Sequence, residues 1–108
     1  MNPKNIFEGN KVVLPREIIY ESSIEEPVGI ALAEIEESEP HFHEKTTEWY
    51  LVTKGVGVVS LDGKEFQLKE YDFLEIPPNA VHSVKSEDKI IVWVISYPPW
   101  RKKDHYKV

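Results

Sequence analysis

Three histidines and one glutamate are spaced so that they could share one metal ion. His41 and His43 are two residues apart, and on an extended strand alternate side chains point to the same face. Glu48 follows polar residues 44–47, which could form a tight turn that returns its carboxylate to the two histidines. His82 comes later, directly after a proline-rich turn at 77–79. Three imidazoles and one carboxylate suit a divalent ion such as Fe, Mn, Ni, Cu, Co or Zn.

The elements that must position these residues are short strands between turns. Eight prolines interrupt the chain, and no stretch keeps a helical apolar period for three turns. Asp62-Gly63 predicts a two-residue hairpin turn. Many short strands are typical of an all-β sandwich or barrel. We expect them at 12–14, 17–20, 28–35, 49–53, 56–61, 64–68, 71–76, 81–84 and 90–97, the last two joined by a charged turn at 86–89.

The spacing of these residues resembles the cupin family. Its first motif is Gly-x5-His-x-His-x3,4-Glu-x6-Gly, and His41, His43, Glu48 and Gly55 stand at the required places. Its second motif is Gly-x5-Pro-x-Gly-x2-His-x3-Asn, in which Pro77 and His82 match. Four flanking positions deviate: they are Ile35, Tyr71, Asn79 and Ser86. Asn79 is a mild deviation because asparagine tolerates a positive φ, whereas Ile35 and Tyr71 predict that the adjoining turns differ in shape.

The resemblance implies an all-β fold, the cupin double-stranded β-helix or jelly-roll barrel, in a single domain. We expect residues 28–97 to form the barrel, 1–27 to add N-terminal strands that pack on the barrel or on a partner subunit, and 98–108 to form a C-terminal tail. The resemblance also implies His41, His43, Glu48 and His82 as ligands of one divalent transition metal per chain. A homodimer is expected by the same analogy. The aromatic Trp100 and Tyr106 of the C-terminal tail could contribute apolar surface to its interface.

Alternation along the strands predicts further residues of the barrel interior. If Glu48 points inward, so do Tyr50 and Val52, and Tyr50 is a candidate catalytic hydrogen-bond or proton donor. Phe73 and Trp93 are further candidates for a pocket wall, although all three aromatics could equally be ordinary core. The inward face of 90–97 stays open. We interpret His105 as a solvated residue because it has no partner at ligand spacing, and the other acidic residues as surface charge.

Composition excludes several classes of function. A chain of 108 residues favours one domain, and the absence of cysteine excludes disulfides, thiolate metal sites and a thiol nucleophile. A net charge of −6 argues against nucleic acid or an anionic membrane as partner. No signal peptide is indicated, so we expect a cytoplasmic protein. Fifteen glutamates and eleven lysines are weakly typical of a thermophile.

The resemblance therefore implies a metal-dependent enzyme acting on a small organic molecule, of dioxygenase or lyase type. A sugar or sugar-phosphate isomerase or epimerase is the alternative, weakened because Arg16 and Arg101 both lie outside the motifs and no phosphate clamp is evident. The second alternative, from another class, is a cupin that binds a small molecule without turnover. Fold alone does not decide among them.

Overall fold

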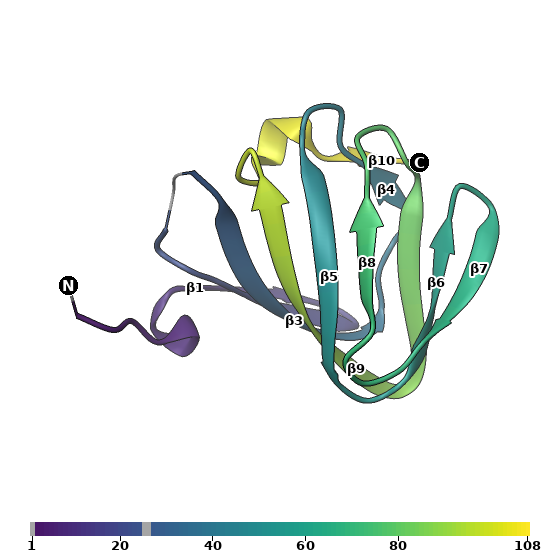
Figure 1. Cartoon of the computed structure of the whole chain (residues 1–108), viewed down its shortest axis with the longest axis horizontal. Coiled ribbons are helices and arrows are strands. Elements are labelled where there is room, and N and C mark those ends of the chain that lie inside the picture. Colours follow the sequence, from purple (N-terminus) through teal and green to yellow (C-terminus); the bar gives the residue numbers. More distant parts are fainter. Residues whose placement is uncertain (1, 25–26) are drawn as a thin grey trace.

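The computed structural model describes residues 2–24 and 27–108, so Met1 and residues 25–26 of the predicted N-terminal segment lie outside the described residues. The described chain is almost entirely strand, with two short 3₁₀ helices, η1 (Ile6–Glu8) and η2 (Lys102–Asp104) (Figure 1). The strands are β1 (Asn10–Leu14), β2 (Glu17–Glu21), β3 (Gly29–Glu37), β4 (His41–Phe42), β5 (Thr47–Lys54), β6 (Gly57–Leu61), β7 (Lys64–Leu68), β8 (Phe73–Ile76), β9 (His82–Tyr97) and β10 (Tyr106–Lys107).

The strands form one antiparallel sheet that curls into a barrel (Figure 1). Strand β9 is the centre of this arrangement, because it pairs with β3, β4, β5 and β6. The N-terminal hairpin β1–β2 extends the sheet through the pairing of β2 with β3. The all-β jelly-roll barrel expected from the motifs is confirmed. Among the described residues, no helix is long and apolar enough to span a membrane.

The expected charged turn at 86–89 is wrong. Strand β9 continues through 86–89 and is sixteen residues long. Its register against β3 shifts there, because Ile35 opposes Ile90 while Glu37 opposes Lys85. The charged stretch is therefore a bulge at which β9 leaves one set of partners for another. A bulge and a turn need similar polar residues, so composition alone did not separate them.

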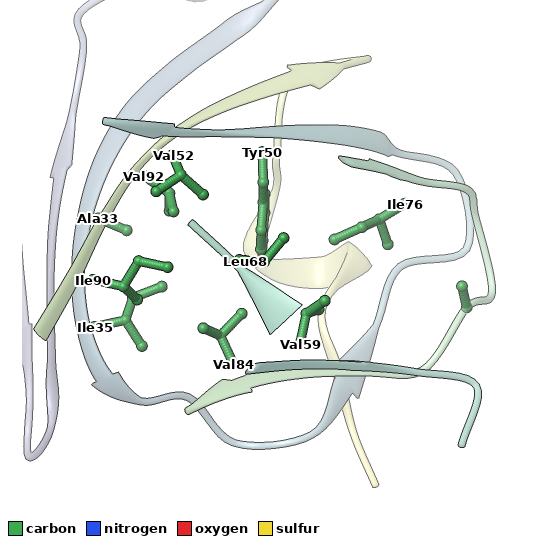
Figure 2. Packing of buried hydrophobic residues seen from close by; sticks show 11 residues of the cluster. Ala33, Ile35, Tyr50, Val52, Val59, Leu68, Ile76, Val84, Ile90 and Val92 are labelled. Carbon is green, nitrogen blue, oxygen red and sulfur yellow. The ribbon is translucent and has the colours of Figure 1, made fainter. Parts of the chain in front are cut away.

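The core lies inside the barrel and follows the alternation expected from the sequence. Tyr50, Val52 and Val84 are buried, and Figure 2 shows their side chains pointing toward one another from the enclosing strands. On β9 the inward residues are the even-numbered ones, since Ile90 and Val92 are fully buried. This resolves the face of that strand, which periodicity had left open.

Two of the three aromatic residues considered for a pocket wall face outward. Phe73 is 78% exposed, and it pairs with Leu51 on the outer side of the sheet. Trp93 is half-buried on the outer face, where it lines a surface hollow with Ile6 and Ile30. Both predictions were wrong because aromatic type indicates strand but does not indicate which face of a strand is buried. Tyr50 alone points into the barrel.

Several turns depend on residues in the left-handed region. Asp62 and Gly63 have φ of 49° and 83°, which confirms the predicted hairpin turn. Asn79 adopts φ of 70°, as its tolerance for that region predicts, and Tyr71 adopts the same φ with its ring exposed. Gly55 has φ of 88°, and a Cβ there would collide with the carbonyl oxygen of Lys89. Ile35 lies within β3 rather than in a turn, and it is part of the core.

Candidate metal centre

The structure brings the four predicted ligands together inside the barrel. One nitrogen from each of His41, His43 and His82 and one oxygen from Glu48 all lie within 4.8 Å of one another. His41 is on β4 directly opposite His82 at the start of β9, so both imidazoles are on one face. His43 follows β4, and Glu48 is the second residue of β5. Three strands and one loop therefore supply the cluster.

Each histidine of the cluster is oriented by a backbone carbonyl. Nδ1 of His41 lies 2.7 Å from the carbonyl oxygen of Glu39, Nδ1 of His43 lies 2.8 Å from that of Asp104, and Nδ1 of His82 lies 2.9 Å from that of Ala80. A carbonyl oxygen only accepts, so each Nδ1 must carry a proton and donate it. In the neutral rings the lone pairs are therefore on the three Nε2 atoms. Metal-bound histidines are held by the same kind of contact.

The centre of the cluster contains polar atoms without hydrogen bonds. Nε2 of His43, Nε2 of His82 and Oε1 of Glu48 are buried and have no hydrogen-bond partner. Oε1 of Glu48 lies 3.2 Å from each of these two nitrogens. Two lone-pair nitrogens facing a carboxylate oxygen repel it unless a proton or a metal cation lies among them, and unpaired buried polar groups are costly. The donor set therefore fits a divalent cation.

The electrostatics of the metal-free cluster keep Glu48 ionised. Burial raises the pKa of Glu48, but His43 and His82 together lower it to about 2. Burial lowers the pKa of His43, yet the pairing with Glu48 and the Asp104 contact leave it raised overall. Burial and the neighbouring His82 lower the pKa of His41 to about 4, so that ring is neutral at pH 7. A carboxylate and neutral imidazole are the forms that bind a metal ion.

The two halves of the motif are linked through the backbone. The N–H of Asn79, in the proline-rich turn, donates to the carbonyl oxygen of His43 at 2.6 Å. The side chain of Asp62, from the β6–β7 hairpin turn, accepts from the N–H of Val81 at 2.9 Å. The first bond holds the proline-rich turn against His43, and the second holds the residue just before His82 against the hairpin turn. The turns thus set the relative positions of ligands that are far apart in sequence.

Asp104 is a site residue that the sequence analysis missed. Its Oδ1 accepts from the N–H of Glu44 at 2.8 Å, and its Oδ2 accepts from those of Lys45 and Thr46 at 3.1 and 3.2 Å. These three residues form the polar turn between His43 and Glu48, which the spacing did predict. Although burial raises the pKa of Asp104, these backbone N–H groups lower it overall. No local pattern marked Asp104, because its partners lie about sixty residues away.

His105 is not the solvated residue that was expected. Its ring stacks on His41 with centroids 4.4 Å apart and 13° between planes, and it lies 5.3 Å from the ring of His43. It is half-buried, and burial together with His43 lowers its pKa. The cause is strand β10, which pairs with β4 so that Lys107 opposes His41. The C-terminal segment (residues 98–108) therefore packs across the barrel beside the metal cluster.

Two further ionisable groups lie on the inner side of the barrel. Glu17 opposes Ile35 and so shares its inward face, and burial followed by the charge of Glu48 raises the pKa of Glu17 to about 7. Tyr50 is buried with its ring 6.1 Å from that of His82, and burial raises its pKa well above the usual range. Glu17 was interpreted as surface charge, since β2 had no pattern that distinguished its two faces.

A curled antiparallel barrel with a His₃Glu cluster at one end defines the class of protein. Comparison with known sequences agrees: the family described as "Cupin domain" matches residues 30–97. The chain belongs to the cupin family.

Individual relatives extend the comparison. An uncharacterized protein of Aquifex aeolicus is 32% identical over 119 residues, covering 99% of this chain and 95% of that protein. Quercetin 2,3-dioxygenase of Bacillus subtilis is 42% identical over 45 residues, which cover 42% of this chain and 13% of the dioxygenase. The solved structure of Streptomyces Pac13, a nucleoside dehydratase, superposes with a TM-score of 0.87 at 17% identity, covering all of this chain and 91% of that one. The last likeness bears on fold alone.

Proposed function

We propose that this cupin is a divalent-metal-dependent enzyme that acts on a small organic molecule, by dioxygenase-type or lyase-type chemistry. His41, His43, Glu48 and His82 would hold one metal ion per chain. The quercetin 2,3-dioxygenase relative supports the first reaction type, and a dehydratase with the same fold is compatible with the second. The proposal adds a reaction type to the family assignment, and membership of the family alone does not imply that reaction type.

One observation carries the proposal. Three buried ligand atoms have no hydrogen-bond partner, while every Nδ1 of the three histidines contacts a backbone carbonyl. With the ring protons on Nδ1, these neighbouring atoms cannot hydrogen-bond to one another, and unpaired buried polar atoms destabilise the fold. The arrangement places one carboxylate oxygen and one ring nitrogen from each of three histidines within 4.8 Å of one another, as metal coordination requires.

The chain's own residues supply the rest of the chemistry. A bound divalent cation polarises substrate oxygen atoms and lowers the pKa of a ligated water. Glu48 contributes the negative charge that attracts the ion. Tyr50 and Glu17 are two ionisable groups whose pKa is raised by burial and then by the charge of Glu48. Their raised pKa values keep both side chains protonated at mildly acidic pH, so each could donate a proton or a hydrogen bond.

The alternatives differ in what they need. A sugar-phosphate isomerase would need a cation to hold the phosphate, but Arg16 is exposed and paired with Glu37 at 2.7 Å. Arg101 is exposed in the C-terminal segment, where it contacts the carbonyl oxygens of Pro99 and Trp100. A non-catalytic binding cupin would keep the metal and show no turnover. The homodimer expected from the sequence stays a prediction.

Metal content is the first test. Protein purified anaerobically should carry about one divalent ion per chain by elemental analysis, and His82→Ala and Glu48→Gln should each lose most of it. Asp88→Ala is the matched control, because Asp88 is exposed on the same strand as His82. Wild-type metal content in both ligand variants would refute the assignment.

Turnover is the second test. Fe- and Mn-loaded protein should be screened with catechols, β-diketones, oxalate, hydroxylated substrates that can lose water, and sugar phosphates. Consumption of dioxygen or loss of water supports the enzyme proposal, whereas isomerisation of a sugar phosphate supports the first alternative. Tight binding without turnover across the panel would contradict the enzyme proposal and favour the binding module.

A further inference from the structure

His105 lies at the metal cluster without belonging to its ligand group. Its ring is stacked on that of His41 and nearly edge-on to that of His43. The four-residue ligand group, however, does not include it. It comes from the C-terminal segment, whereas the ligands come from β4, β5 and β9. A fourth imidazole is therefore placed beside the ion's position by an independent part of the chain.

The proton of His105 is on the opposite ring nitrogen from that of the three ligands. The indole Nε1–H of Trp100 donates to Nδ1 of His105 at 3.3 Å. An indole nitrogen only donates, so Nδ1 of His105 must be the lone-pair nitrogen and the neutral ring carries its proton on Nε2. Among the described residues, Nε2 of His105 has no hydrogen-bond partner. Beside the three acceptor nitrogens of the ligand group, His105 thus offers one N–H that no described residue accepts.

Trp100 is itself held by the barrel. Its backbone N–H donates at 3.2 Å to Oγ of Ser96, which is buried on the inward face of β9. The indole also packs edge-on to His105, with ring centroids 5.9 Å apart. The tautomer of His105 is therefore set by a side chain whose backbone is fixed to the same strand that carries His82.

We infer that His105 is a substrate-positioning residue whose Nε2–H donates to an oxygen of a small molecule bound at the metal centre. This inference rests on the proposed function. The ligand class follows from the chemistry: one oxygen on the ion and a second, neighbouring oxygen that accepts from His105, as in a carboxylate, a hydroxamate or an α-hydroxycarbonyl group. Because the Nδ1 of His105 already accepts from Trp100, the ring offers a single N–H to the bound molecule, which suits one oxygen of such a group.

The test begins with the tautomers of the metal-free protein. Two-bond ¹H–¹⁵N correlation spectra should show His41, His43 and His82 with the proton on Nδ1 and His105 with the proton on Nε2. Trp100→Phe keeps an aromatic ring and removes the indole donor, so it should convert His105 to a mixture of tautomers. A proton on Nδ1 of His105 in the wild-type protein would overturn the inference.

Ligand binding is then measured on Co(II)-loaded protein with acetohydroxamate as the probe, by titration of the visible spectrum. His105→Phe keeps a planar ring beside His41 and lacks the donor, and we expect it to bind Co(II) like the wild type and acetohydroxamate about tenfold more weakly. His105→Gln, which restores an N–H donor, should recover part of this loss. Lys103→Ala, an exposed residue of the same segment, should behave like the wild type.

The outcomes separate the two levels of the argument. If the wild type takes up no Co(II), the proposed function fails and the role of His105 fails with it. If the wild type binds Co(II) and the probe while His105→Phe binds the probe equally well, the inference alone is overturned. If His105→Phe loses Co(II) itself, His105 acts on the metal and the substrate-positioning role is likewise overturned.

Discussion

The motif residues and the C-terminal segment contribute to the same site in different ways. The motif places four ligand atoms within 4.8 Å of one another by short spacing on paired strands. The C-terminal segment supplies no ligand, but its Asp104 orients His43 and holds the turn before Glu48, and its His105 stacks on His41. The candidate ligands thus come from local sequence, while a segment from the far end of the chain orients His43 and supports the turn before Glu48.

The largest expected effect concerns the ligands. At a metal concentration of 100 times Kd, binding stabilises the fold by about 2.7 kcal/mol, which corresponds to a rise in Tm of about 10 °C for a domain of this size. Chelation should reverse the rise, and His82→Ala should abolish it. Differential scanning calorimetry with and without Mn(II) measures it. An equal rise in His82→Ala would place the stabilising ion elsewhere.

The next effect tests whether the C-terminal segment positions the ligands. Asp104→Ala removes the acceptor of three backbone N–H groups, so we expect a loss of about 1 to 2 kcal/mol in unfolding free energy. Metal affinity should fall about tenfold, because the turn that carries His43 and Glu48 loses its support. Urea denaturation and metal titration measure the two quantities. Asp88→Ala, at an exposed position, is the control. Equal stability and metal affinity of the two variants would show that the C-terminal segment does not position the ligands.

A smaller effect belongs to Glu17 on the barrel side. Its folded pKa of about 7 is above the ordinary value of 4.5, so the folded protein binds more protons than the unfolded chain between these values. The stability of metal-free protein should therefore fall as pH rises from about 4.5 to 7 and then level off. Glu17→Gln should remove this slope and raise stability at pH 8 by about 1 kcal/mol, since the half-buried group is partly screened. A slope unchanged in Glu17→Gln would assign it to another group.

The smallest effect is expected at the edge of the C-terminal segment. Lys107 and Glu39 form an ion pair of 3.2 Å with both side chains about three-quarters exposed. Such pairs contribute less than about 0.5 kcal/mol, so Lys107→Ala should leave both Tm and metal affinity close to the wild-type values. A loss comparable to that of Asp104→Ala would mean that the Lys107–Glu39 ion pair also supports the site.

Much of the barrel and its candidate metal-binding cluster could be predicted because the relevant signals are local. Alternation identified Tyr50, Val52 and Val84 as inward residues, and Asp62-Gly63 identified its hairpin turn. The errors have a common cause. The bulge at 86–89, the outward faces of Phe73 and Trp93, and the placement of His105 all depend on which distant strand lies alongside, and no local pattern records that.

By itself, the sequence determined the all-β class, the family and the four residues able to bind a metal, since these depend on residue type and on spacing within or between short motifs. The tertiary structure decided the rest. It brought Asp104 and His105 about sixty residues along the chain to the motif through the β4–β10 pairing, and it directed Glu17 inward. It also gave the four histidines different tautomers, because a ring's tautomer depends on the partner of its Nδ1. That partner is a carbonyl oxygen for His41, His43 and His82, and the indole N–H of Trp100 for His105.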